Sequence, residues 1–182
     1  DLYSRIVYGA RISFYVALFS IAIGTSVGYL LGIVSGYFGG MTDDIIQRFV
    51  DAKLAFPSLL LALAMVTVLG PGLDKVIIAI SLTFFPRAAR VARGMVLSAK
   101  ENVYVDAARV IGASPLRIML RHILPNSMAP LIILASIGLG QAILTEASLR
   151  YLGLGVPPPH ASWGRELSRG ATVFAQEAPW MM

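Results

Sequence analysis

The sequence predicts an all-α, polytopic membrane protein, and two observations support this fold class. The chain has 182 residues, of which 57% are hydrophobic and only 14% charged, and its mean hydropathy is +0.74. Soluble domains carry about 25% charged residues. Several long runs also contain no Asp, Glu, Lys or Arg. We therefore expect residues 1–182 to form a single transmembrane domain.

Three uncharged runs are long enough to cross a bilayer as helices, which takes about 20 residues. They cover residues 12–42, 54–73 and 123–145. The second run is expected to belong to a helix that starts near Asp44 and bends at Pro57, because proline removes a backbone donor. The third is entered through Pro125 and carries Pro130 near its start, where a missing donor costs least.

A fourth span is predicted over residues 76–98, although a proline and three arginines interrupt it. Arg87, Arg90 and Arg93 recur every three residues after Pro86 and can share one helical face. On that face they would snorkel toward lipid headgroups or line a cavity covered by protein. The chain is thus expected to contain four spans.

Positive charge is concentrated between Arg87 and His122, and it orients the predicted bundle. This segment has seven Lys or Arg against Glu101 and Asp106, so its net charge is +5, equal to that of the whole chain. Cytoplasmic loops of membrane proteins carry the excess of Lys and Arg. The loop over residues 99–124 is therefore predicted to be cytoplasmic, together with residues 37–43, whereas residues 70–75 and 147–175 lie outside.

Small residues recur every four positions in the first span. Ser20 begins the series, and the glycines that continue it are Gly24, Gly28, Gly32 and Gly36. One face of this helix is therefore almost bare backbone, which favours close packing of a second helix. The alternative is the ordinary glycine richness of membrane helices.

The basic loop is predicted to fold as a helix, a hinge and a second helix. The first helix, over residues 101–111, has a narrow stripe with two alanines at its centre, formed by Tyr104, Ala107, Ala108 and Ile111. Gly112 follows as a left-handed helix stop. Ser114 and Pro115 are typical of the N-cap and first position of a second helix.

Three interpretations of this loop are open. It could lie on anionic lipid as an amphipathic segment held by its arginines. It could bind nucleic acid, but basic charge is only the electrostatic part of such binding, and no recognition fold is visible. The third interpretation is a docking element for a cytoplasmic protein.

Residues 106–125, DAARVIGASPLRIMLRHILP, resemble the EAA loop of ABC-importer permeases. That loop contains Glu-Ala-Ala, a glycine four residues after the second alanine, and Leu-Pro about a dozen residues later. The residues that match in register are Ala107, Ala108, Gly112, Leu124 and Pro125. Asp106 stands where Glu is usual, which keeps the charge but shortens its reach, and His122 stands where Ile is usual.

Further blocks resemble the second permease subunit of the dipeptide, oligopeptide and nickel branch of this family. They are DLYSRIVYGARIS, GIVSGYFGG, VDAKLAFPSLLLA, VLGPGL and EASLRYLGLGVPPPHASWG, and the ending RHILPN points to the same branch. The resemblance implies the ABC type I importer permease fold with about six spans. The chain would then be a fragment that lacks a span before Asp1 and another after Met182.

The resemblance also implies partners in the cell (inner or plasma) membrane and on both sides of it. These are membrane lipid, a second permease subunit, two cytoplasmic ABC ATPase subunits and an extracytoplasmic solute-binding protein, without nucleic acid. ATP would be bound by the ATPases, so no cofactor is expected in this chain. The binding protein would dock near residues 151–164, for which a connection stiffened by prolines is the alternative.

The same resemblance implies an ATPase-coupling role for seven residues of the loop: Tyr104, Asp106, Ala107, Ala108, Gly112, Leu124 and Pro125. Asp106 would be the charge partner of a basic residue in the ATPase. The two alanines would form the close-contact face, and Gly112 would be the hinge.

A secondary carrier or channel without ATPase partners is the main alternative. The three uncharged spans hold no acid or base that could couple protons or sodium, and the nearby candidate is Glu146, at the outer end of the last span. The chain itself is not expected to be an enzyme, because it contains no phosphate-binding loop. With no cysteine and two separated histidines, His122 and His160, no metal site is expected.

Overall fold

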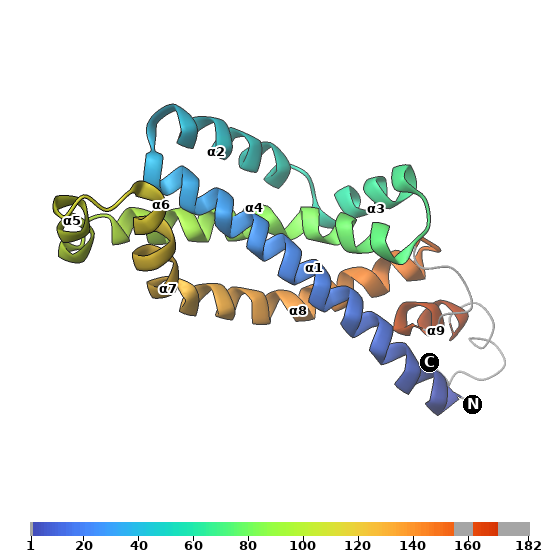
Figure 1. The fold of residues 1–182 in the computed structure, drawn as a ribbon. Coiled ribbons are helices and arrows are strands. Elements are labelled where there is room, and N and C mark those ends of the chain that lie inside the picture. Colours follow the sequence, from blue (N-terminus) through green and yellow to red (C-terminus); the bar gives the residue numbers. More distant parts are fainter. Residues whose placement is uncertain (1, 155–161, 171–182) are drawn as a thin grey trace. The chain divides into compact units, whose positions relative to one another are not determined.

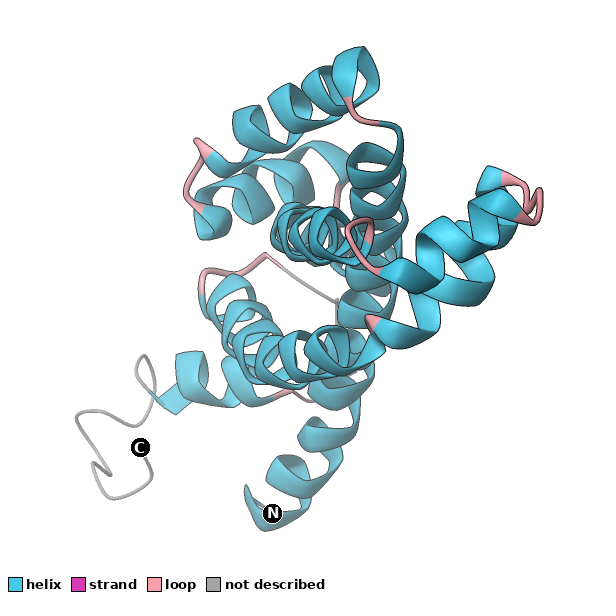
Figure 2. Cartoon of the chain, turned by 90° about the vertical axis from the view of Figure 1, so that its left-hand side faces the viewer, coloured by secondary structure: helices cyan, strands magenta, loops and turns pink. Residues whose placement is uncertain are grey.

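The computed structural model describes residues 2–154 and 162–170, and all secondary structure in these residues is helical (Figure 1). Figure 2 shows helices joined by short loops, with no strand in the described part of the chain. The predicted all-α class is therefore confirmed. In chain order the segments are α1 (Leu2–Phe38), α2 (Gly40–Leu54), α3 (Ser58–Leu69), α4 (Leu73–Ala99), α5 (Val103–Val110), α6 (Pro115–Arg117), the π-helix η1 (Ile118–Ile123), α7 (Leu124–Asn126), α8 (Met128–Tyr151) and α9 (Trp163–Arg169).

Two of the described helices, α1 and α8, are each long and apolar enough to cross a membrane. α2 and α3 meet the same test only as a pair, which would make them one broken span. α4 does not meet it: its 27 residues are sufficient, but its arginines add too many charges. By length and composition, the described chain therefore has two or three spans, where four were predicted.

The corner between α1 and α2 forms at two glycines with positive φ, Gly39 at 65° and Gly40 at 51°. The backbone N–H of Gly39 donates to the carbonyl of Ser35 and closes the end of α1. The sequence predicted a helix start near Asp44. Because both glycines turn the chain together, α2 instead begins at Gly40.

The predicted bend at Pro57 is a break between two helices. α2 ends at Leu54, and α3 starts at Ser58. Pro57 is extended, with ψ at 127°, and its carbonyl accepts the first helical bond, from the N–H of Leu61. Pro57 has no N–H group, but at the start of a helix this group would not form a helical hydrogen bond, so the helix loses none. α4, in contrast, continues through Pro86, as the sequence predicted.

Contacts between residues group the chain into two compact units. The first comprises residues 1–22, 57–83 and 138–182, and the second comprises residues 23–56 and 84–137. α1, α4 and α8 contribute residues to both. The second unit has a buried apolar core drawn from α1, α4, α5 and η1: Tyr29, Ile33, Ala92, Val96, Val105, Ala108, Ile118, Met119 and Ile123. This core holds the loop that the sequence singled out.

Candidate functional site

The loop between α4 and α8 is the candidate coupling site, and its local structure follows from its sequence. α5 begins after Asn102, which is extended, and Gly112 follows it with φ at 78°. The Ser114 side chain accepts a hydrogen bond from the N–H of Arg117, and Pro115 takes the first helical position. The predicted order of helix, left-handed glycine and second helix is confirmed. In Figure 1, α5, α6 and α7 gather beside the end of α4.

The second helix contains a π-helical stretch that the sequence did not predict. η1 runs between α6 and α7, and Pro125 is the second residue of α7. Pro125 has no N–H to donate to the preceding turn, and the wider i→i+5 turns of η1 lie directly before it. The sequence signal that could have indicated this irregularity is Pro125.

The inner face of α5 is fixed to the membrane helices of its unit. Val105 is fully buried and Ala108 is 3% exposed, and both belong to the apolar core that includes Tyr29 of α1 and Val96 of α4. Small side chains allow α5 to lie close to its neighbours. The contacts of Ala108 are therefore within its own chain.

The outer face of α5 is apolar and exposed. Val103, Val110 and Ile111 are each more than 80% exposed, and Ala107 is exposed between them. The sequence placed Ala107 and Ala108 together on a close-contact face, but the structure separates them: Ala107 faces outward and Ala108 inward. Asp106 is also exposed, and its carboxylate accepts a hydrogen bond of 2.9 Å from Arg109, one turn along the helix.

The end of the loop is tied to α1 through Tyr29. Its hydroxyl donates to the carbonyl of Leu124 at 3.2 Å and also bonds to the hydroxyl of Ser127. Leu124 packs against the core of the same unit, whereas Pro125 is exposed. Sequence reasoning named Leu124 and Pro125 but not Tyr29, because an isolated tyrosine in an apolar run gives no signal of its partner.

Tyr104, the remaining predicted residue of the loop, lines an open cavity of about 650 Å³ in the second unit. The cavity is lined by the end of α4, the residue before α5, and the chain around the start of α8, and its lining includes Met95, Ser98, Asn102, Asn126 and Pro130. Tyr104 thus borders this cavity at the start of α5.

The glycines of α1 lie against α4 without intervening side chains. A Cβ atom built on Gly32 would come within 2.3 Å of the Ala89 carbonyl oxygen, and one on Gly36 within 2.8 Å of the Val96 Cβ. Gly28 approaches the carbonyl of Phe85 still more closely, and Gly24 is buried. At Gly28 and Gly32 the two helices are in contact through their backbones, and at Gly36 the backbone of α1 lies against the Val96 side chain.

Two arginines of α4 pair with acidic residues of α2, an arrangement that sequence reasoning missed. Arg93 donates twice to Asp43, at 2.7 and 2.5 Å, and Ser35 also donates to Asp43. Arg90 donates once to Asp51, at 2.5 Å. Asp43 and Asp51 are eight residues apart on α2 and share a face, so the spacing was a usable signal. Both pairs offset charge on α4 that would otherwise disfavour a membrane position.

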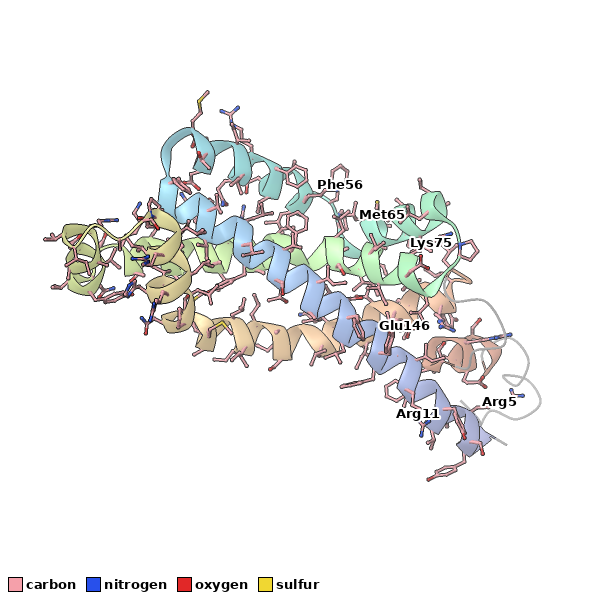
Figure 3. All side chains as sticks on the ribbon, viewed as in Figure 1. Arg5, Arg11, Phe56, Met65, Lys75 and Glu146 are labelled. Carbon is pink, nitrogen blue, oxygen red and sulfur yellow. The ribbon has the colours of Figure 1, made fainter. Side chains whose placement is uncertain are left out.

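In the first unit, Glu146 lies fully buried on α8, where α1 passes it (Figure 3). Its carboxylate accepts a hydrogen bond of 2.8 Å from Ser13 of α1 and forms an ion pair of 2.8 Å with the Nε of Arg150. Arg150 is itself 5% exposed. The residue considered for ion coupling is therefore held between two partners of its own chain.

The outer segment at residues 151–164, considered for a binding protein, lies partly outside the described residues. Of its described part, Ser162 is buried and Gly164 lies against α8, where a built Cβ would come 2.3 Å from the Ala147 carbonyl oxygen. The indole N–H of Trp163 donates to the carbonyl of Ile6 in α1. These contacts fix α9 to α1 and α8 within the first unit.

A solved structure shares this fold. The inward-facing form of the MetNI methionine ABC transporter aligns with 97% of this chain and 83% of that chain, with a TM-score of 0.69 and 21% sequence identity. At that identity the likeness concerns the fold, and it confirms the predicted importer permease fold.

Sequence relatives match nearly the whole chain. The dipeptide transport system permease protein DppC of Alkalihalophilus pseudofirmus is 44% identical over 99% of this chain, and the di/tripeptide permease DppC of Pseudomonas aeruginosa is 42% identical over 100%. The glutathione transport system permease protein GsiD of Pectobacterium atrosepticum is 41% identical over 92%. The chain spans 59% and 60% of the lengths of the two DppC proteins, and 56% of GsiD.

A family match leads to the same assignment. Residues 28–178 match the family described as binding-protein-dependent transport system inner membrane component. Together with its apolar helices, this match identifies a multi-pass membrane protein. The chain belongs to the family of inner membrane components of binding-protein-dependent transport systems.

Proposed function

We propose that this chain is part of a permease subunit of an ATP-driven importer of short peptides. The relatives at 41–44% identity are named for the transport of dipeptides, di- and tripeptides, and glutathione, all of which are short peptides. The partners would be a second permease subunit, two cytoplasmic ABC ATPase subunits that bind the ATP, and an extracytoplasmic solute-binding protein. The chain would form half of the translocation pathway and carry no catalytic residue of its own.

The observation that carries this proposal is the two-faced structure of α5. Its inner face is buried with Tyr29 and Val96, while its outer face leaves Val103, Val110 and Ile111 exposed. Exposed apolar groups gathered on one short helix are typical of a surface that a partner covers. Asp106, at 63% exposure, can exchange Arg109 for a basic group of the ATPase.

This structure would transmit motion in a simple way. Because α5 shares a core with α1, α4 and η1, a force applied to its outer face would move these segments together. Packed cores resist deformation and pass displacement on to their neighbours. Closure of the ATPases on ATP would thus change the membrane pathway, with the loop over residues 99–124 on the cytoplasmic side.

Co-purification of the full-length protein would test the proposal. The tagged permease, extracted in mild detergent, is compared with the variants Ala107→Trp and Ala129→Trp. Both alanines are exposed, but Ala129 belongs to the start of α8 and not to α5. We expect ATPase subunits to accompany the wild-type protein and Ala129→Trp, and to be lost from Ala107→Trp.

Two results would contradict the proposal. If the wild-type protein is extracted without ATPase subunits, the alternative of a secondary carrier or channel is favoured, and Glu146 becomes the residue to test. If Ala107→Trp retains its ATPases, the exposed face of α5 is not the docking surface.

A further inference from the structure

The Asp51–Arg90 pair differs from its neighbour in a way that suggests a function. Arg93 and Asp43 form a two-bond pair with side chains 35% and 14% exposed, supported by Ser35. Arg90 and Asp51 share one bond, and their side chains are 54% and 58% exposed. The first pair is built as a structural link between α2 and α4. The second leaves a guanidinium face and a carboxylate oxygen open.

The open pair lies far from the start of α2 and from the end of α4. Asp51 comes 11 positions after Gly40, the first residue of α2, or about 17 Å along the helix axis at ~1.5 Å per residue. Arg90 comes nine positions before Ala99, the last residue of α4, or about 14 Å. α2 also belongs to the bent pair α2–α3, which is long and apolar enough for a span only when the two helices are taken together. Exposed charges at such a depth face water or protein and not lipid.

We propose that Asp51 and Arg90 form a binding site for the two charged ends of a short peptide as it passes through the membrane. Asp51 would bind the α-ammonium group, and Arg90 would bind the α-carboxylate. The inference rests on the proposed peptide permease and adds to it a site and a chemical reason for selection.

The chemistry of the pair suits this substrate class. A guanidinium presents five N–H donors in a planar fork that matches a carboxylate, and Arg90 uses one of its nitrogens on Asp51. Asp51 accepts through one oxygen. Both side chains are exposed enough to part and admit a peptide between them.

Electrostatic neutrality also favours exchange over tight binding. In the empty site the two side chains neutralise each other, and a zwitterionic peptide leaves the site neutral when it takes their place. A peptide with only one charged end would pair with one of the two side chains and leave the other without a partner, so it would gain fewer charge-assisted hydrogen bonds from the exchange. The internal pair competes with the substrate, so binding stays weak enough for release, as conduction requires.

The test uses the complete importer in proteoliposomes with its binding protein and ATP. The described chain has no native cysteine, so Ala55→Cys and Met41→Cys each introduce a thiol into it. Ala55 is exposed one helical turn after Asp51, whereas Met41 is exposed at the start of α2. Each is labelled by a small thiol reagent with and without dialanine, and with N-acetyl-dialanine amide, which lacks both charges.

We expect dialanine to slow the labelling of Ala55→Cys severalfold while leaving Met41→Cys unchanged, and the blocked peptide to protect neither. Equal labelling rates of Ala55→Cys with and without dialanine, in vesicles that import it, would overturn the site. Absence of dialanine uptake by the wild-type importer would instead overturn the proposed function. The two failures are therefore distinguishable.

Two charge variants supply a second readout. Asp51→Asn and Arg90→Gln should each raise the dialanine concentration for half-maximal uptake roughly tenfold, as expected for loss of a hydrogen bond to a charged group. Their protein yield and ATPase recovery should match wild type. Unchanged half-saturation, or a loss of yield alone, would show that the pair is structural and would overturn the proposal.

Discussion

A Cβ atom on Gly28 would lie 2.1 Å from the carbonyl oxygen of Phe85, so α1 and α4 touch there through their backbones. The substitution Gly28→Ala should therefore destabilise the protein by about 1–3 kcal/mol, the usual range for overpacking a filled site. Thermal unfolding of the detergent-solubilised full-length subunit measures this.

Gly94 is the matched control, because a Cβ built there meets no atom within 4 Å. Gly94→Ala, in the interior of α4, should be neutral or stabilising by up to about 1 kcal/mol, since alanine loses less backbone entropy than glycine in a helix. Equal effects of the two substitutions would contradict the close approach of α1 and α4.

The buried Glu146–Arg150 pair predicts a large loss of stability when it is broken. Glu146→Gln leaves the guanidinium of Arg150 buried without a charged partner, which costs about 3–5 kcal/mol in comparable sites. The double substitution Glu146→Leu with Arg150→Met should recover much of this loss, because it removes both charges. The melting temperatures of the variants measure these effects. Glu146→Gln as stable as the wild-type protein would refute a structural role for the Glu146–Arg150 pair.

Asp43 and Asp51 should respond differently to loss of charge. Asp43→Asn weakens a two-bond pair with Arg93 and a contact with Ser35, so it should lower stability by roughly 1–3 kcal/mol. Asp51→Asn removes one exposed bond, and exposed pairs contribute at most about 1 kcal/mol. Chemical denaturation of the two variants, compared side by side, measures the difference, and a larger loss at Asp51 would contradict it.

The side of the membrane on which α5 lies can be measured directly. Val110→Cys, on the exposed face of α5, should react with a membrane-impermeant thiol reagent from the cytoplasmic side only. Asp74→Cys, exposed in the first turn of α4, should react from the opposite side only. Labelling of both positions from one side would contradict the predicted topology.

The main helices of this protein could be predicted from its sequence, because they depend on local signals. Uncharged runs located the two long apolar helices, and Gly112 with Ser114 and Pro115 marked the turn inside the loop. These residues act through their own backbone conformation, so their effect does not depend on a distant partner.

Features that depend on partners far away in the sequence could not be predicted in the same way. A stripe of Ala107 and Ala108 looks continuous on a helical projection, but the position of the core decides that Ala108 is buried and Ala107 exposed. Arg90 and Arg93 suggested snorkelling because no carboxylate lies within one turn of them in their own helix. Their acceptors lie on α2, about 40 to 50 residues earlier in the chain.

The two glycines at the corner of α1 and α2 have a consequence for chirality. A Cβ at Gly39 or Gly40 meets no atom within 4 Å, so space is not what excludes a side chain. The positive φ values of both residues disfavour L-amino acids by about 1–2 kcal/mol each. A D-alanine would adopt the same backbone without that strain, so this corner discriminates by handedness and not by volume.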